Sequence, residues 1–152
     1  MANSNKKEIE TRLGKRTITL DKIITFPRGI IGYEEKREFT LLQLKEDAPF
    51  LLLQSTEDSQ LGFLVCDPFS FFNDYQIKVG DAEQLLLQIE RVDQVAVLCT
   101  VTIPLGKPED ISINLSGPIL INHEAHIGLQ VPQVETKYQS RIYLNKLNKL
   151  TD

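Results

Sequence analysis

The sequence predicts a mostly β protein: a small single-domain antiparallel β-barrel-like fold with one short helix. Short segments rich in Ile, Val, Leu, Phe and Thr recur along the chain, and Gly, Pro, Asp or Asn separate them at intervals of about eight to twelve residues. Hydrophobic residues make up 41% of the chain and charged residues 25%, which is the balance of a folded globular domain. The length of 152 residues is also usual for one domain.

Each predicted strand is a short apolar or alternating run that ends at a turn-forming residue. The runs lie at residues 17–27, 39–44, 49–55, 61–69, 74–79, 95–104, 110–122 and 126–134. Only AEQLLLQIERV, residues 82–92, has helical spacing, with Leu85, Leu86 and Ile89 on one side and Asp81 placed to cap its start. The segment YQSRIYLNKLNKL, from residue 138, is expected to form a short amphipathic helix or a frayed end.

We expect residues 1–152 to form one domain, with about residues 1–12 flexible and about residues 145–152 forming a tail. No apolar run approaches the roughly 18 residues of a membrane helix, and no apolar segment of a secretory signal follows the basic residues at the start. A cytoplasmic protein is therefore expected. Cys66 and Cys99 lie inside apolar segments, which favours buried free thiols over a disulfide or a reactive thiol.

The charge is unevenly distributed along the chain. Residues 23–135 contain 17 acidic and 7 basic residues, a balance of −10, whereas the two ends together contain 10 basic and 4 acidic residues. An acidic body repels nucleic-acid phosphates and favours basic partners.

The stretch FPRGIIGYEEKREFTLL, residues 26–42, has the glycines of a phosphate-binding loop but not its pattern. Lys and Ser/Thr do not follow at the required spacing, and two carboxylates stand where an anion would bind. Pro27, Gly29 and Gly32 instead indicate tight turns. We expect Tyr33, Glu34 and Glu35 to stand on a rigid exposed corner and to contact a protein partner.

Other chemical motifs are incomplete. In NHEAHIG, residues 122–128, the second histidine comes one residue too early for a helical zinc motif, so a hairpin turn with solvated histidines is expected. Acidic residues, serines and histidines are present, but none lies in a recognisable nucleophile motif. We expect no catalytic residue, no bound cofactor and no metal.

The segment DPFSFFNDYQIKV, residues 67–79, combines aromatic rings with carboxylates. Its phenylalanines could close one end of the core, form a protein interface or bind another ligand. Pro68 and the Asn-Asp pair at 73–74 break the segment, so not every ring can point inward. We expect Asp67, Phe71, Phe72, Asp74 and Tyr75 to form a partner surface.

Taken together, these segments resemble the FliW family of flagellar assembly factors. The resemblance rests on FPRGIIGYE followed by FTLL, on APFLLLQS, on LGFLVCDPFSFFNDY, and on INLSGPILIN followed by IGLQV, in family order from about residue 17 to residue 144. It implies a non-catalytic β-barrel-like protein that binds flagellin and, alternatively, the RNA-binding translational regulator CsrA.

The resemblance also implies a direction of regulation: FliW-like proteins release flagellin mRNA from repression by capturing CsrA. Flagellin ends are amphipathic helices, and a groove formed by Ile30, Ile31, Ile119 and Val131 would suit them, although all four also suit a core. Direct nucleic-acid binding and membrane binding are not expected. The alternative is a β-barrel that binds single-stranded nucleic acid or a small ligand.

Overall fold

A computed structural model describes residues 5–45, 49–134 and 138–144. The strands within these ranges are β1 Lys6–Thr11, β2 Gly14–Thr19, β3 Ile24–Thr25, β4 Glu38–Gln43, β5 Phe50–Ser55, β6 Gly62–Cys66, β7 Val95–Thr102, β8 Ser112–Ile113, β9 Ile119–Asn122, β10 Ile127–Gln130 and β11 Ile142–Tyr143. The helices there are α1 Asp81–Leu86 and the 3₁₀ helices η2 Leu20–Lys22, η3 Pro68–Ser70, η4 Val92–Gln94 and η5 Pro108–Asp110.

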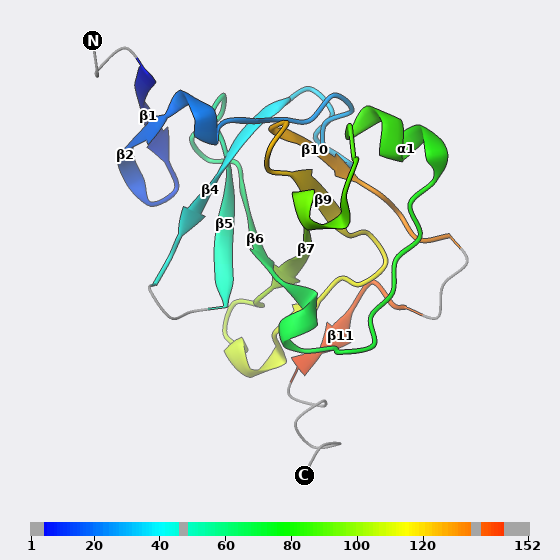
Figure 1. Ribbon diagram of the computed structural model, residues 1–152. Coiled ribbons are helices and arrows are strands. Elements are labelled where there is room, and N and C mark those ends of the chain that lie inside the picture. The colour runs from blue at the N-terminus through cyan, green and yellow to red at the C-terminus, as the bar shows by residue number, and fades with distance from the viewer. Residues whose placement is uncertain (1–4, 46–48, 135–137, 145–152) are drawn as a thin grey trace.

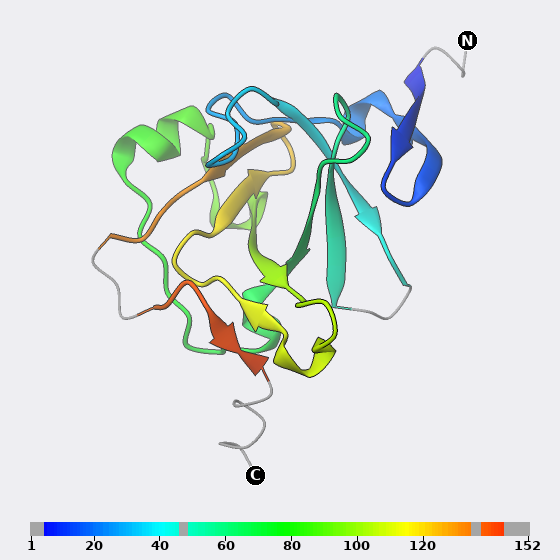
Figure 2. The same cartoon turned by 180° about the vertical axis from the view of Figure 1, so that it is seen from behind.

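The main sheet curls into a barrel-like body, which confirms the predicted mostly β fold. Its strand order is β11-β8-β7-β6-β5-β4-β3-β10-β9, and β9 also pairs with β7, so the sheet returns onto itself (Figures 1 and 2). The neighbours pair antiparallel except at one place, where Ile127 of β10 lies parallel to Thr25 of β3. The predicted antiparallel barrel-like fold therefore includes one parallel contact.

The backbone pairing between β6 and β7 is incomplete. Only Val65↔Thr100 and Cys66↔Cys99 pair across these strands, whereas Gly62–Cys66 all pair with β5 on the other edge. Beyond Thr100, β7 continues along β8, which pairs with Val101 and Thr102. The two strands therefore diverge towards the start of β6.

Aromatic and branched side chains fill the barrel interior. Phe26 and Phe39 are both fully buried, with ring centroids 5.3 Å apart in an edge-to-face arrangement. Their neighbours in the same core include Leu53, Val65 and Ile119. Gly128 lies against this core, since a Cβ added to it would come within 2.4 Å of the Phe26 ring. The strand β10 can approach Phe26 only because residue 128 has no side chain.

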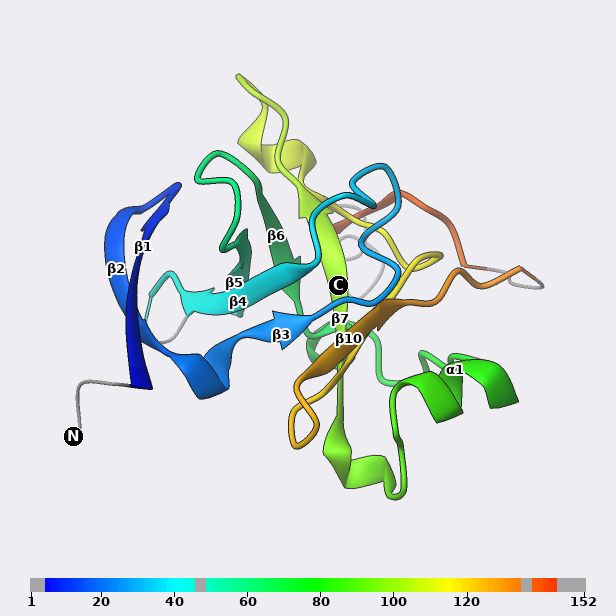
Figure 3. The ribbon, with the colours of Figure 1, turned by 90° about the horizontal axis from the view of Figure 1, so that it is seen from above.

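Residues 6–11 form a strand within the segment, about residues 1–12, that was expected to be flexible. β1 and β2 form a separate two-stranded hairpin, from Lys6↔Thr19 to Thr11↔Gly14, that stands beside the barrel (Figure 3). Ile9 and Ile18 are buried, so the hairpin has an apolar face. Polar and apolar residues alternate towards the end of KKEIET, which is a pattern typical of a strand. The high charge of the segment favoured disorder instead, so the strand was not predicted.

One buried amide fixes the hairpin to the barrel. The fully buried side chain of Gln54 accepts a hydrogen bond from the Arg12 backbone N–H at 3.0 Å. Its Nε2 donates to the backbone oxygens of Ser55, Asp58 and Ser59 at 3.0, 3.2 and 3.3 Å. The tip of the hairpin is therefore held by a group on β5.

Replacing Gln54 with alanine is expected to lower the free energy of unfolding by about 1–3 kcal/mol, because it leaves buried backbone groups without partners. Amide hydrogen exchange at Arg12 should accelerate as well. Chemical denaturation and exchange measured by NMR check the two effects. Gln60→Ala, at an exposed position in the adjoining turn, is the matched control. Unchanged exchange at Arg12 would contradict the role assigned to Gln54.

Four local predictions are wrong for physical reasons. The helix ends at Leu86 instead of residue 92, because Gln88 has a left-handed φ of 56°. Gly80, not Asp81, is its N-cap, and Leu85 faces solvent with 79% of its surface exposed. Residues 74–79 form no strand; Gln76 N–H donates to the Tyr138 hydroxyl at 2.8 Å instead.

The predicted helical tail is also corrected where it can be compared. Residues 142–143 form β11, which pairs antiparallel with β8, and the remainder of the predicted tail, residues 145–152, lies outside the described residues.

Candidate functional site

The corner at residues 26–37 is a tight double turn, as the sequence predicts. Gly29 and Gly32 have φ values of +65° and +90°, and Ile30 and Tyr33 form an isolated antiparallel bridge. A Cβ on Gly29 would lie 2.6 Å from the Glu34 Cα, so the chain crosses itself closely here. Arg37 supports the turn from the other side, because its Nε donates to the Glu34 carbonyl at 2.7 Å.

The predicted contact residues of this corner are at the surface. Tyr33 is 47% exposed, and its ring packs edge-to-face on Phe63 with centroids 5.3 Å apart. Glu34 and Glu35 are exposed. The Glu34 carboxylate accepts a hydrogen bond from the Gly32 N–H at 2.7 Å, so it also holds the loop.

The corner at residues 67–75 is built on η3. The Asp67 carboxylate caps this turn by accepting from the Phe69 N–H at 2.8 Å, and Pro68 occupies the first turn. Asp67 and Asp74 are exposed. Phe69, which the predicted contact set leaves out, is the ring that stands at the surface, with 42% exposed.

The other aromatic residues of this corner lie deeper. Phe71 and Phe72 are half-buried and pack against the apolar cluster that contains Cys66 and Cys99. Tyr75 is only 3% exposed, and its hydroxyl donates to the Leu115 carbonyl at 2.6 Å. Burial raises the pKa of the Tyr75 phenol. Tyr75 is therefore a core residue, which corrects the expectation that it contacts a partner.

The structure does not bring the two corners together. Residues 26–37 lie at the upper end of the barrel near α1, and residues 67–75 lie at its lower end near β11 (Figure 1). An ion pair of 3.9 Å between Arg28 and Glu83 ties the first corner to α1.

The two corners also differ in charge. Residues 26–37 contain two acidic and three basic residues, whereas residues 67–77 contain Asp67 and Asp74 and no Lys or Arg. Only the lower corner is therefore acidic on balance.

The four residues that were expected to form one groove differ in burial: one is exposed at the surface and three are buried. Ile31 is 62% exposed, and Ile30 is 2% exposed beneath it. Ile119 is fully buried in the barrel interior, and Val131, 6% exposed, packs with Leu87 in the core next to α1. Ile119 and Val131 therefore contribute nothing to the surface, which corrects their assignment.

A groove does open beside Ile31, at the place where β6 and β7 diverge. We call this cavity of about 660 Å³ the β6 groove. Its walls are the first residues of β6 and the end of β7, with Ile30, Ile31 and Gln130 on a third side. Arg12, from the tip of the β1–β2 hairpin, is the one charged residue among those that line it. Sequence reasoning missed Arg12, because the chain up to about residue 12 was expected to be flexible.

Gln130 orders the third side of the β6 groove. Its Oε1 accepts from the Ile31 N–H at 3.0 Å, and its Nε2 donates to the Gly117 carbonyl at 3.1 Å. One amide therefore joins the upper corner to the segment between β8 and β9.

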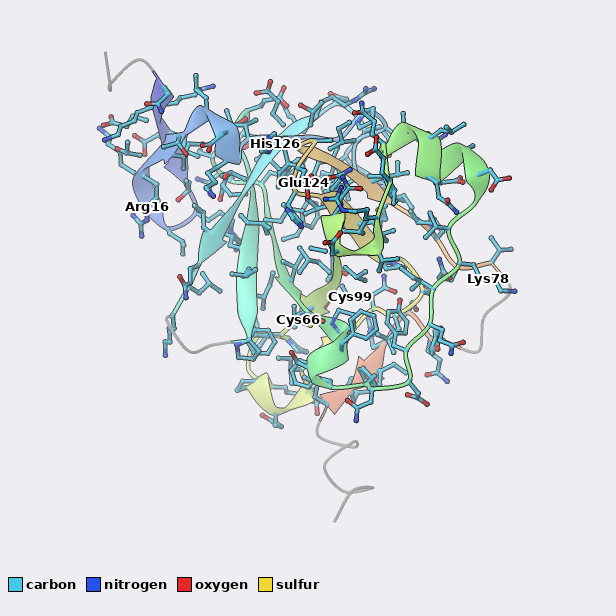
Figure 4. The ribbon with its side chains drawn as sticks, in the orientation of Figure 1. Arg16, Cys66, Lys78, Cys99, Glu124 and His126 are labelled. Atoms are coloured by element: carbon cyan, nitrogen blue, oxygen red, sulfur yellow. The ribbon has the colours of Figure 1, made fainter. Side chains whose placement is uncertain are left out.

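The two thiols are buried, and the two histidines lie in a turn. Cys66 and Cys99 are free, buried and opposite each other in register, near the centre of the body, as expected for inert thiols (Figure 4). Burial raises the pKa of both thiols to about 12. His123 and His126 lie at the turn between β9 and β10, as predicted, and His123 Nε2 is 2.9 Å from the Asp93 carbonyl oxygen.

The described residues contain neither a group suited to a metal ion nor a helix suited to a membrane. No cluster of three or more His, Cys, Asp or Glu side chains suited to a metal ion occurs among the described residues. Within those residues, no helix has both the length and the apolar character needed to cross a membrane.

Comparison with known proteins gives a consistent result. A sequence model described as FliW protein matches residues 7–144. The flagellar assembly factor FliW of Nitratidesulfovibrio vulgaris strain DP4 is 60% identical over 145 residues, which cover 95% of this chain and 84% of the relative. That of Desulfovibrio desulfuricans is 47% identical over 149 residues, covering 97% and 89%.

A solved structure agrees with these sequence matches. The crystal structure of a flagellar assembly factor FliW superposes with a TM-score of 0.85 at 35% identity, covering 91% of this chain and 96% of that one. The family model spans the barrel and most of the N-terminal hairpin. The chain therefore belongs to the FliW family of flagellar assembly factors.

Proposed function

We propose that this protein is a cytoplasmic partner switch that binds flagellin and, alternatively, the translational regulator CsrA. Abundant unsecreted flagellin occupies the protein and leaves CsrA free to repress flagellin mRNA. Once flagellin is exported, the protein captures CsrA and translation resumes. The protein acts by binding and transforms no substrate.

The lower corner supports the CsrA half of this proposal. An RNA-binding regulator presents cationic surface, and a docking site for it should carry uncompensated carboxylates. Asp67 and Asp74 are exposed, residues 67–77 contain no Lys or Arg, and Phe69 supplies apolar contact area in the same segment. Exposed rings next to charges are typical of the contact surfaces between proteins.

Charge repulsion would let the protein oppose RNA without covering the RNA surface. A single carboxylate about 10 Å from a phosphate repels it by about 0.4 kcal/mol at the dielectric of water, before screening by salt. Several carboxylates that face several phosphates, partly shielded from water, would together approach the roughly 1–3 kcal/mol typical of coupling between sites. The excess of acidic residues over residues 23–135 acts in the same direction.

The upper corner is the candidate site for flagellin. Ile31 and Tyr33 are 62% and 47% exposed, and they offer apolar surface to an amphipathic helix of monomeric flagellin. Because the corners lie at opposite ends of the barrel, flagellin and CsrA would act on each other at a distance.

A double substitution that removes two negative charges tests whether the lower corner binds CsrA. Asp67→Asn with Asp74→Asn should weaken binding of CsrA from the same genome about three- to tenfold, mainly through a slower association rate. Asparagine at 67 retains an oxygen that can cap η3, so the fold should be unaffected. Association is measured by surface plasmon resonance at two salt concentrations, and the difference between variant and wild type should shrink as salt rises.

Glu34→Gln with Glu35→Gln is the matched control, since it removes two charges from the upper corner. An equal loss from both pairs would show that net charge, not the lower corner, attracts CsrA. A shift of bare RNA by the wild-type protein would instead favour the nucleic-acid-binding alternative. Flagellin that displaces CsrA from the wild type, but not from Ile31→Glu, would support the upper site.

A further inference from the structure

The β6 groove contains an open strand edge. In an antiparallel ladder, alternate residues direct their N–H and C=O groups to the same neighbour. Ser55 N–H donates to the Leu61 carbonyl at 2.9 Å, so Leu61, Phe63 and Val65 face β5. Gly62 and Leu64 therefore direct their backbone groups to the other edge, towards β7.

That second edge is only partly used. Cys66 meets Cys99 and Val65 meets Thr100, after which no strand pairs with the start of β6 on this side among the described residues. The N–H groups of Gly62 and Leu64 consequently face the β6 groove. The exposed apolar residues Ile31 and Ile103, 62% and 47% exposed, flank the opening.

Arg12 marks one end of this edge. Its Nη1 donates to the Gly62 carbonyl at 3.1 Å, which positions the guanidinium at the start of β6. A guanidinium has five N–H donors, so others remain for a ligand. Within the described residues, Arg12 forms no ion pair with a carboxylate. The groove thus combines an open backbone edge, neutral walls and a single cation at one end.

We propose that the β6 groove binds an extended peptide segment of another protein, which adds as an antiparallel strand to Gly62–Leu64. Antiparallel pairing directs the C-terminal end of the segment towards the start of β6, where Arg12 lies. The segment therefore carries a carboxylate at that end and uncharged, β-branched residues along the rest. The volume of about 660 Å³ is in the range of pockets that enclose a ligand. Backbone pairing provides the affinity, and Arg12 selects the register.

This inference does not depend on flagellin or CsrA, so its failure and that of the proposed function are distinguishable. The probe is a synthetic seven-residue peptide of alternating threonine and valine that ends in aspartate. It is titrated into the full-length ¹⁵N-labelled protein, and the backbone amides are followed by NMR. The Gly62 and Leu64 amides should shift and become protected from exchange. No shift at millimolar peptide would overturn the proposal.

N-methylated peptides test whether the contact is a strand addition. Methylation of every second amide should abolish binding in one of the two alternating registers and leave it unchanged in the other, because only one set of N–H groups faces β6. Equal binding of both methylated peptides would overturn the proposal.

A charge exchange tests the orientation. Arg12→Glu should weaken binding of the peptide about tenfold, and a peptide ending in lysine should recover it. Arg16→Glu is the matched control, since Arg16 is exposed on the same hairpin, away from the β6 groove (Figure 4). An equal loss in the two variants would contradict the role of Arg12.

A second copy of the chain is the competing occupant. Sedimentation equilibrium without peptide should show no self-association through this edge. A dimer that the peptide dissociates would assign the β6 groove to a second copy and overturn the choice of partner.

Discussion

Replacing Phe26 with alanine should lower the free energy of unfolding by about 3–5 kcal/mol, as is typical for loss of a large aromatic side chain from a core. Phe26 is fully buried, packs edge-to-face on Phe39 and touches the backbone at Gly128. The rigid barrel walls leave little room for collapse around the cavity. Urea denaturation with matched m-values measures the change. Phe69→Ala, which truncates an exposed ring, is the control and should change stability far less.

A double-mutant cycle with Gly128 sharpens this prediction. Gly128→Ala alone should destabilise the protein by about 1–3 kcal/mol, since its methyl group would overlap the Phe26 ring. In the Phe26→Ala background the same methyl group enters the cavity, so the penalty should disappear or reverse. Additive effects of the two substitutions would contradict the contact between residues 26 and 128.

The second large effect concerns the upper corner. Gly29→Ala should destabilise the protein by about 2–4 kcal/mol, because left-handed backbone disfavours a side chain and the new methyl group would overlap backbone. The φ of Gly29 is +65°, and its added Cβ would lie 2.6 Å from the Glu34 Cα and 2.8 Å from the Glu34 carbonyl oxygen. Thermal or urea unfolding gives the size of the effect.

Gly32→Ala separates the two causes in the Gly29 prediction. Gly32 also has a positive φ, of +90°, but no atom lies within 4 Å of its added Cβ. Backbone strain alone should therefore reduce its stability by about 1–2 kcal/mol. Equal losses at positions 29 and 32 would mean that the close approach to Glu34 contributes nothing.

The sequence predicts the strands of the barrel because each carries a local pattern. The runs at 39–44, 49–55 and 95–104 overlap β4, β5 and β7 closely, since apolar runs between turn residues define them. The turns at Gly29 and Gly32 were equally predictable, because few residues other than glycine adopt such φ values.

Features that depend on tertiary contacts were not predictable in the same way. Residues 74–79 have strand composition, but side chains from Tyr138 and Gln133 take their backbone hydrogen bonds. The helix at 82–92 stops early, and its buried leucine is Leu87, not Leu85. The loss of the strand at 74–79 depends on residues distant in the sequence, which a local pattern does not contain.

The candidate site was only partly predictable from the sequence. Exposure of Tyr33, Glu34, Glu35, Asp67 and Asp74 follows from turn chemistry, and the structure places all five at the surface. The burial of Tyr75 and Ile119 does not follow from turn chemistry, because an apolar residue beside a turn can point into the core or towards solvent. The β6 groove could not be predicted from the sequence, because it arises where two strands diverge and where the tip of the β1–β2 hairpin packs against the barrel.

The parallel contact between β3 and β10 has a consequence for how the chain reaches its native state. Ile127 and Thr25, which are far apart in the sequence, must pair before the barrel-like sheet can close. The strands β1 and β2, in contrast, are joined by a short turn and pair locally. Proteins dominated by such non-local pairings fold in milliseconds to seconds, because loop entropy is lost before the pairing stabilises the chain. On the ribosome, the hairpin can form early in synthesis. The closed arrangement of strands can form only after residues 127–130 have left the exit tunnel, and until then the edge of β3 that faces β10 remains unpaired.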